Sequence, residues 1–600
     1  MFEKELAHAA SQIRKALEIL EIPVPEEVTW APTPFHAQWG YGSPVCLQAA
    51  AAEARAGKKV NVPVRAEKMA QLVLEKIGTP EGFARSESAS GYLNFYVEPS
   101  AYARRVLDTV IEQGEDFGRG EPKIERVMVE FAQPNTHHSF HIGHARNAIL
   151  GESLSRIMSF AGFDTIRASY PGDIGLGVIT CIWAYRKFHL GKEPQGIHKR
   201  GQWLASIYTE AHSLLNPDES DTPAQAAQRE AYQAEVRELY QAWDAGDSDV
   251  RQLWLETRQW SLDELDAILE LLDIKMDVYF FESEADAPSK EIVEELIQLG
   301  IADDERPSGG PVVVKIDEKL GLQSEKYRSP VILRSDGTTL YLTKDLALAK
   351  QKFEQHKVDR SIYVVDLRQR LHFQQAFKIL ELWGFSQAPK CYHLAYGFVT
   401  LPEGAMSSRK GNIVLFMDVY EEACKRVSAI IAEKNPSLSE DQRELAARQV
   451  GLGALAYAML AVDTTRAIVF EWDRALDFEG QAAPYIQYAH VRASSILAKA
   501  RRLPKSMLPD YALEPSEINL LERISRFPEI VQRAAKEYKP LIVANYAYEL
   551  ARDFSDFYTN CPVLQAEGNK RDIRLRLVHA TKVTLANSLH LLDIEAPEVM

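Results

Sequence analysis

From Arg126 onward the chain alternates between short runs of apolar residues and helical stretches. The run at residues 127–131 is typical of a buried strand, and a loop and a helix beginning near Gly143 follow it. Further strands are expected over residues 311–316, 331–334, 361–365 and 392–398, with helices between several of them. Strands that alternate with helices favour a doubly wound sheet of parallel strands, which makes this region an α/β domain.

The 600 residues are enough for several domains, and the patterning suggests three. Residues 1–115 begin with helical patterning and end near an alternating strand at 91–97, which predicts a small α/β domain, with a linker at 112–122. Residues 120–430 form the expected parallel-sheet domain, with a helical insertion at about 185–270 that contains the Ala- and Gln-rich stretch 216–249. No strand pattern returns after Ser437, so residues 437–600 are expected to form an all-helical domain.

Composition sets limits on compartment and partners. The five cysteines are scattered without close Cys or His pairs, so we expect a reduced cytoplasmic protein without a disulfide framework or a structural metal. The first ten residues carry charges where a signal peptide would need an apolar run. The longest apolar stretch, residues 451–462, is too short to cross a bilayer, so no membrane partner is expected.

The first motif with chemical content is His-Ile-Gly-His at residues 141–144, here called the first signature. At a helix start, free N–H groups and the positive end of the dipole favour phosphate. Gly143 would let a flat adenine approach the backbone, and His141 and His144 can donate hydrogen bonds to a phosphate. A glycine kept for packing and a polar helix start explain the same residues. A metal site is also conceivable, although no carboxylate or cysteine completes it at ligand spacing; its histidines would be His137, His138, His141 and His144.

The second motif, residues 405–411, is here called the second signature. It combines hydroxyl groups with adjacent cations after a glycine, which suits a loop that closes over a triphosphate. A solvated basic loop is the alternative explanation. Its proposed catalytic members are Met406, Ser407, Ser408, Arg409 and Lys410.

Together the two signatures resemble the ATP motifs of class I aminoacyl-tRNA synthetases, and the flanking sequence is similar to the arginyl enzymes. Matching stretches lie in the family's order along nearly the whole chain, at residues 130–135, 277–283, 340–345, 363–372, 470–480, 484–492 and 596–600. The resemblance implies a Rossmann-like catalytic domain, an N-terminal domain that touches tRNA and an all-helical anticodon-binding domain. It also implies ATP with Mg²⁺ as substrate, and L-arginine and tRNA(Arg) as partners, in an enzyme that is usually a monomer.

An arginine pocket needs carboxylates for the guanidinium group and acceptors for the ammonium group. Asp345, expected four residues after Tyr341 at a strand end, and Glu282 are candidates, although most single carboxylates lie on the surface. The resemblance implies that these three side chains contact the guanidinium. It places Asn135, Gln369 and His144 around the other end of the amino acid, and the matched residues Glu130, Gln133 and Pro134 beside the pocket.

Two positions depart from the family pattern. Many members carry a lysine that binds the α-phosphate where this chain has His138, and Ala405 replaces the first lysine of the second signature. An imidazole is largely neutral at pH 7, so it does not replace an ammonium group. We therefore expect Arg409 and Lys410 to supply more of the phosphate contact, and His138 to contribute when protonated.

Local charge favours an RNA partner although the whole chain carries −16. Residues 490–582 contain 16 Lys and Arg against 11 Asp and Glu, so this segment carries +5 and the remainder −21. Tyrosines in the helical region could stack on loop bases, or could simply be core residues; they are Tyr485, Tyr488, Tyr546, Tyr548 and Tyr558. Candidate tRNA contacts are Asn94, at a position that touches a D-loop base in some relatives, Tyr488 and Arg492.

These observations predict ATP-dependent ligation of arginine to tRNA(Arg) through an adenylate, a first step that can require bound tRNA. A cofactor nucleotidylyltransferase shares the HxGH motif but leaves the basic helical region unexplained. A non-catalytic RNA-binding relative would explain His138 and Ala405. A cysteinyl enzyme would be expected to have zinc-binding cysteines, which the scattered cysteines do not provide.

Overall fold

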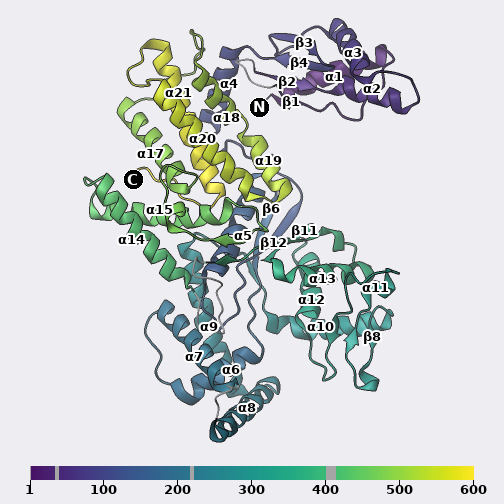
Figure 1. Ribbon diagram of the computed structural model, residues 1–600, viewed down its shortest axis with the longest axis vertical. Helices are drawn as coiled ribbons and strands as arrows, with labels where there is room; N and C mark the ends of the chain where they lie inside the picture. The colour runs from purple at the N-terminus through teal and green to yellow at the C-terminus, as the bar shows by residue number, and fades with distance from the viewer. Residues whose placement is uncertain (1, 34–38, 217–221, 401–413) are drawn as a thin grey trace. The chain divides into compact units, whose positions relative to one another are not determined.

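The computed structural model describes residues 2–33, 39–216, 222–400 and 414–600 (Figure 1). They divide into two compact units, each assembled from segments far apart in the sequence. Unit 1 comprises Met1–Phe117, Ala489–Phe527 and Glu549–Asn587, and unit 2 comprises Gly118–Tyr488, Pro528–Tyr548 and Ser588–Met600.

The core of unit 2 is the expected parallel sheet, with strand order β12-β11-β5-β6-β7. Its central strands are buried because their residues are apolar on both faces. The strands are β5 (Arg126–Glu130), β6 (Asp164–Ser169), β7 (Val278–Tyr279), β11 (Arg360–Asp366) and β12 (Cys391–Tyr396).

The chain order reverses across the central strand of this sheet. After β5 the chain adds β6 and β7 on one side, then returns to place β11 on the other side of β5. Ligands of open α/β sheets bind outside the carboxyl ends of the strands at such a reversal. The first signature follows β5 and Gln369 follows β11, so the topology directs both to this edge.

Helix α5 (Ile142–Phe160) connects β5 to β6 and packs against the sheet. Gly151 permits this close approach, because a Cβ atom at that position would overlap the ring of Phe131. The predicted helix start near Gly143 is thus correct to within one residue.

The helical insertion is a bundle of four α-helices between β6 and β7. Its core is rich in tryptophan and contains Trp183, Trp243, Trp254 and Trp260. The helices are α6 (Leu176–Ala184), α7 (Ile197–Leu215), α8 (Pro223–Asp244) and α9 (Ser248–Leu271), with a π-helical turn at Tyr185–His189.

Two of the expected strands do not join the parallel sheet. Residues 311–316 and 331–334 contribute β9 (Val312–Val313) and β10 (Val331–Leu333), which pair with β8 (Asp303–Asp304) in a separate antiparallel sheet. Both strands lie in an apolar core with three helices, so their residues are buried without being part of the main sheet. These helices are α10 (Glu282–Gln298), α12 (Tyr341–Gln355) and α13 (Arg370–Leu382), and the short α11 (Ile316–Lys319) follows β9.

The remainder of unit 2 is mostly helical, but the expectation that no strand follows Ser437 is wrong. Residues Ile468–Val469 form β14, which pairs in parallel with β13 (Val399–Thr400). Such a two-residue strand is too short to leave a period-2 pattern in the sequence. The helices of this region are α14 (Phe416–Lys434), α15 (Glu440–Leu460), α16 (Trp472–Ala475) and α19 (Phe527–Glu537), and α17 (Ala483–Ala500), α20 (Pro540–Asn560) and α21 (Gly568–Leu591) extend into both units.

Unit 1 contains an antiparallel sheet of order β1-β2-β4-β3, with the expected strand at 91–97 as β4. Helical segments from the C-terminal third complete the unit, where Tyr102 donates a hydrogen bond to Ser525 Oγ at 2.6 Å. The N-terminal elements are α1 (Glu3–Ile19), β1 (Ala31–Pro32), β2 (Gly40–Ser43), α2 (Val45–Arg55), α3 (Val62–Ile77), β3 (Arg85–Ala89), β4 (Tyr92–Tyr96) and α4 (Pro99–Gln113), and α18 (Pro515–Ser525) belongs to the C-terminal part. Part of the expected linker is therefore helical, since α4 reaches Gln113 and a 3-10 turn follows at Gly114–Asp116.

The five cysteines are all free thiols, and burial is the main cause that raises the pKa of each. Within the described ranges no helix is both long and apolar enough to cross a membrane. The same residues hold no group of three or more His, Cys, Asp or Glu side chains placed to bind a metal ion.

Candidate active site at the carboxyl ends of β5 and β11

The two histidines of the first signature form the N-terminal cap of α5. The Nδ1 atom of His141 accepts hydrogen bonds from the N–H groups of Gly143 (3.1 Å) and His144 (3.3 Å). In return, His144 Nδ1 accepts from the N–H group of His141 (3.4 Å), and the rings stack with centroids 3.7 Å apart. A neutral imidazole that accepts through Nδ1 carries its proton on Nε2. Each ring therefore presents one Nε2–H donor.

Burial keeps both rings neutral. It is the main cause that lowers the pKa of His141 to about 4, with smaller effects from the charges of His138 and Arg368. The pKa of His144 lies well below its ordinary value, again chiefly because of burial. At neutral pH the first signature thus offers two uncharged donors. Gly143 leaves room for the His141 ring, since a Cβ atom there would lie 2.9 Å from His141 Cε1 and the ring would have to shift.

The loop that leads into the first signature is held in a conformation that residues other than glycine seldom adopt. Ala132 (φ 52°) and His137 (φ 66°) both have positive φ angles. The Asn147 side chain fixes the start of the loop, because it accepts from the N–H group of Ala132 (2.5 Å) and donates to the carbonyl of Val364 (2.7 Å) in β11.

His137 fixes the middle of the loop against α9. Its ring nitrogens contact Thr136 Oγ1 and Thr257 Oγ1, each at 2.9 Å, and its N–H group donates to Ser261 Oγ at 2.9 Å. The Thr257 hydroxyl already donates to the carbonyl of Leu253, so it accepts from His137 Nε2–H. Burial lowers the pKa of His137 to about 3, so this ring is neutral and structural.

His138 is oriented differently from the two signature histidines. Its Nδ1–H donates to the carbonyl oxygen of Thr136 at 3.1 Å, and its ring lies 4.1 Å from that of Tyr208 in α7. When neutral, its remaining nitrogen, Nε2, can only accept a hydrogen bond. Burial lowers the pKa of His138 and so opposes the protonated form that a phosphate would need.

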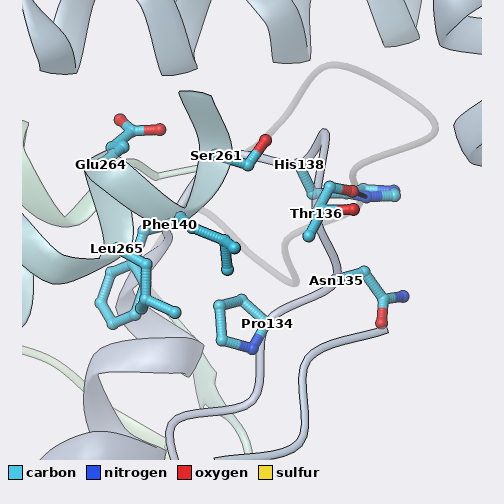
Figure 2. Close-up of a pocket in the computed structure, with 9 residues that line it drawn as sticks. Pro134, Asn135, Thr136, His138, Phe140, Ser261, Glu264 and Leu265 are labelled. Atoms are coloured by element: carbon cyan, nitrogen blue, oxygen red, sulfur yellow. Dashed lines mark hydrogen bonds between the residues drawn. The ribbon is translucent and has the colours of Figure 1, made fainter. Parts of the chain in front are cut away.

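A recess lies beside this loop, between residues 134–140 and α9 (Figure 2). Glu264 lies on its α9 side and is 4% exposed. Burial alone raises the pKa of Glu264 to about 7. The other residues that line the recess are Pro134, Asn135, Thr136, His138, Phe140, Ser261, Leu262 and Leu265.

The expected arginine pocket contains two buried ion pairs. Glu130, the last residue of β5, pairs with Lys352 of α12, and both side chains are almost fully buried. Glu282, the first residue of α10, pairs through Oε1 with Lys344 Nζ at 2.8 Å. Burial raises the pKa of both carboxyl groups, and the lysine charges oppose that shift. Glu282 Oε2 makes no hydrogen bond to any described residue, so it is free to accept one.

The sequence suggested that Tyr341 and Asp345 lie at the end of a strand. In the structure they lie in the first turns of helix α12. The preceding strand β10 ends at Leu333, and the Leu and Ala residues of this segment repeat at helical spacing. Tyr341 is 65% exposed, and Asp345 Oδ2 accepts a hydrogen bond from His372 Nε2.

The remaining expected pocket residues lie around the same edge of the sheet. Asn135 is exposed, and its side chain packs with that of Glu282 against Gly172, where any Cβ atom would overlap Asn135 Oδ1. Gln133 donates to the carbonyl of Val364 at 3.2 Å and leaves its buried Oε1 without a partner among the described residues. Pro134 is buried in the loop, and Gln369 is exposed at the end of the short helix after β11.

Sequence reasoning missed three residues here. Asp173 is fully buried, pairs with Arg258 at 2.8 Å and caps α10 by accepting from the Ser283 N–H group at 2.9 Å. The hydroxyl of Tyr170 is buried without a partner among the described residues, and four carboxylates around it help burial to raise its pKa. The third is Gly172. The Pro-Gly-Asp sequence at 171–173, which is typical of a turn, was the available signal, but the strand before it had not been predicted.

Comparison with known proteins agrees with this geometry. Residues 107–472 match the family model described as tRNA synthetases class I (R), catalytic domain, and residues 486–600 match the DALR anticodon binding domain. An arginine–tRNA ligase of Bdellovibrio bacteriovorus is 37% identical over 521 residues, which are 86% of this chain and 87% of the relative. One from Clostridium perfringens is 33% identical over 89% of this chain and 90% of its own.

The chain belongs to the arginyl-tRNA synthetase family.

A solved structure of Thermus thermophilus arginyl-tRNA synthetase is similar over 99% of both chains, with a TM-score of 0.79 and 29% identity. A Plasmodium falciparum arginyl-tRNA synthetase, at 21% identity and a TM-score of 0.74, supports the fold alone. The predicted family, fold class and enzyme class, a class I arginine–tRNA ligase, are confirmed. The roles of individual site residues stay predictions.

The predicted residues of the second signature lie outside the part of the chain that the structure describes. They are Met406, Ser407, Ser408, Arg409 and Lys410, together with Ala405.

The candidate tRNA contacts occupy different elements. Asn94 lies opposite Gly42 in the sheet of unit 1, where its side chain fills the space that a Cβ atom at 42 would need. Tyr488 is 43% exposed on α17, and the guanidinium of Arg492 lies 4.7 Å from the ring centroid of Tyr558. Tyr546 is only 2% exposed and is therefore a core residue and not a surface for stacking.

Proposed function

We propose that this chain ligates L-arginine to tRNA(Arg) in two steps. The arginine carboxylate attacks the α-phosphorus of Mg-ATP, which forms arginyl-adenylate and releases pyrophosphate. The 2′-hydroxyl of the terminal adenosine of the tRNA then attacks the acyl carbonyl and releases AMP. Neither step needs a covalent enzyme intermediate, so the protein acts through positioning and electrostatic stabilisation.

One observation carries the proposal. Two neutral imidazoles cap the N-terminus of α5 through Nδ1, so each keeps its proton on Nε2, and they follow β5 at the strand-order reversal of the sheet. Neutral donors suit a phosphate whose negative charge increases as the attacking oxygen arrives, because their protons stay in place through the step. Arg409 and Lys410 of the second signature would supply the positive charge that neutral histidines lack.

The acidic side of the pocket favours a cationic amino acid. Glu282 has an oxygen available beyond its pair with Lys344. Asp345 follows Lys344 directly in the chain, and it lies with Tyr341 in the first turns of α12. A planar guanidinium binds best to carboxylates that accept paired hydrogen bonds. Asn135, Gln369 and His144 would hold the amino and carboxylate end, with Glu130, Gln133 and Pro134 supporting the pocket.

The wider assignment divides the chain by task. Residues 1–115 would contact the tRNA outside the anticodon, with Asn94 among the contacts. Residues 120–430 would perform the chemistry and residues 437–600 would bind the anticodon, with Tyr488 and Arg492 as contacts. We assign the reaction to a monomer in the cytoplasm, in agreement with five free thiols.

An exchange assay tests the activity. Purified protein is incubated with Mg-ATP, labelled pyrophosphate and each amino acid in turn, with and without tRNA(Arg). Exchange that depends on arginine alone among the amino acids would support the proposal. Exchange with no amino acid but with a mononucleotide acceptor would favour a nucleotidylyltransferase, and tRNA binding without any exchange would favour a non-catalytic relative.

The phosphate assignment has its own test. Lys410→Ala should lower the exchange rate about 100-fold, since it removes a cation that is expected to stabilise the transition state. His138→Ala should have a smaller effect at pH 7.5. Full exchange by Lys410→Ala together with its loss in His138→Ala would show that the assignment is wrong.

A further inference from the structure

Arg146 is a buried cation that forms no ion pair with any described carboxylate, although the charge of Asp366 acts on it. It lies on α5 and is 1% exposed. Its Nη1 donates to the carbonyl oxygens of Gly397, Phe398 (3.4 Å) and Arg466 (2.9 Å), and its Nη2 donates to that of Thr464 (3.1 Å). Burial lowers its pKa to about 10, which leaves the side chain charged at neutral pH.

Backbone carbonyls alone are a weak substitute for water around a guanidinium, and Arg146 Nε lacks a partner among the described residues. A buried arginine of this kind is unfavourable for stability. Its hydrogen bonds can nevertheless fix the position of the segments that accept them. The question is therefore what the four carbonyl groups have in common.

The four carbonyl groups that accept from Arg146 belong to the two segments that form the β13–β14 pair. Gly397 and Phe398 lead directly into β13, which ends at Thr400, the last described residue before the second signature. Thr464 and Arg466 lead into β14. Gly397 N–H also donates to the Thr464 carbonyl at 2.9 Å, and a Cβ atom at 397 would lie 2.6 Å from the carbonyl carbon of Arg466. The backbone at Gly397, just before β13, is thus packed closely against residues 464–466.

The far end of that segment is attached to the first signature as well. The carbonyl of Val414, the first described residue after it, accepts from Ile142 N–H at 3.1 Å. Phe416 N–H donates to the carbonyl of Phe140 at 3.1 Å, and Leu415 forms a bridge with His141. Both flanks of residues 401–413 are therefore bonded to the stretch 140–146.

We propose that Arg146 is a positioning residue for adenylate formation, which fixes the strand that leads into the second signature relative to the histidines of the first. It does not touch substrate. Its effect would be large in this chain because neither residue 138 nor residue 405 is lysine, so phosphate binding depends on the placement of fewer cations. The inference rests on the proposed role of Arg409 and Lys410.

Arg146→Lys tests it. Lysine keeps the charge but has a single nitrogen without the planar fork, so it cannot reach four carbonyls in two segments. In the exchange assay the KM for ATP should rise about tenfold and kcat should fall, while the KM for arginine changes less than about twofold. The matched control is Arg156→Lys on the same helix, where the arginine pairs with Glu152 and Asp593 instead. It should lower Tm comparably and leave the KM for ATP unchanged.

Gly397→Ala approaches the same contact from the other side, since its methyl group must displace the Arg466 backbone. It should give the same selective rise in the KM for ATP, with circular dichroism confirming folded protein. Wild-type KM values in Arg146→Lys, or equal rises for ATP and arginine, would overturn the proposal. If Arg146→Lys does not fold, Gly397→Ala decides, and if neither folds the segment is a folding element and the proposal is rejected. Failure of the second-signature assignment would appear separately, as full exchange by Lys410→Ala.

Discussion

His138 differs from a lysine in the atoms that it can offer to a phosphate. Its Nδ1 proton is committed to the Thr136 carbonyl, so only protonation of Nε2 creates a second donor. Burial lowers its pKa below the ordinary value of 6.5, so the protonated fraction declines as pH rises toward 6.5 and is small in the neutral range. Bound ATP would oppose this decline because its negative charge favours the cation.

We expect the KM for ATP to increase as pH rises toward 6.5 in the unaltered chain and to change little above it. His138→Lys should lower that KM, with a benefit of several-fold at pH 7 that shrinks as pH falls below 6.5, because lysine stays charged throughout. Steady-state exchange at fixed saturating arginine measures both. The same pH profile in His138→Lys and the unaltered chain would contradict a phosphate role for residue 138.

Glu264 links stability to pH. Its pKa of about 7 exceeds the ordinary value of 4.5. Between pH 4.5 and pH 7, Glu264 is therefore protonated in the folded chain and ionised in the unfolded chain. Stability from this group is therefore full below about pH 4.5 and declines as pH rises toward 7. Glu264→Gln removes the titration, and should be more stable than the unaltered chain by roughly 3 kcal/mol at pH 8.

Urea unfolding at pH 5 and pH 8 measures this difference. Glu270→Gln is the control, because Glu270 is exposed on the same helix. A Glu264→Gln variant whose advantage does not increase with pH would contradict the raised pKa.

At the scale of elements, α9 holds the loop of the first signature through His137. Thr257→Val keeps the shape of the side chain but leaves His137 Nε2–H without its acceptor in a buried site. The expected loss of stability is about 1–3 kcal/mol. In a double-mutant cycle with His137→Asn, which tolerates a positive φ angle, the two changes should be non-additive. Additive losses, measured by thermal unfolding, would mean that the two residues do not act together.

Local signals explain what the sequence predicted well. The start of α5 could be located because a polar cap, a glycine and an apolar repeat are neighbours in the chain. The central strand β5 was equally clear, since residues 127–129 are an unbroken apolar run. Both features depend on residues within one element.

Other parts of the site depend on contacts that the sequence does not display. Glu130 and Lys352 are separated by 222 positions, and nothing in either neighbourhood indicates that they pair. The helix that carries Asp345 was mistaken for a strand end, because Thr338, Thr339 and Tyr341 favour strands while the packing of α12 on α10 favours a helix.

For the whole molecule, the basic segment 490–582 has fewer available cations than its composition suggests. Arg523, Arg526, Arg533, Arg574 and Arg576 all pair with carboxylates. Three exposed residues at the end of α17 and just beyond it form no ion pair with any described residue: Lys499, Arg501 and Lys505. These are the cations that we expect RNA phosphates to meet.

Replacing these three residues by Gln should raise the KM for tRNA roughly tenfold. It should also make the plot of log affinity against log salt concentration less steep, by about 0.9 for each of the two to three phosphate contacts that are lost. The KM for arginine should not change. Arg533→Gln is the control, since that arginine already pairs with Glu537 at 3.0 Å. An unchanged salt slope in the triple variant would place the RNA elsewhere.

The raised pKa values of the cysteines have a practical consequence for experiments of this kind. With the pKa of Cys391 at about 11 and that of Cys46 at about 12, and the other three thiols also raised, almost no thiolate forms near pH 7. Maleimide dyes react with thiolates, so the native thiols should stay unlabelled. One cysteine introduced on the surface would then carry a fluorophore alone, and RNA capture could be followed by fluorescence without replacing any native residue.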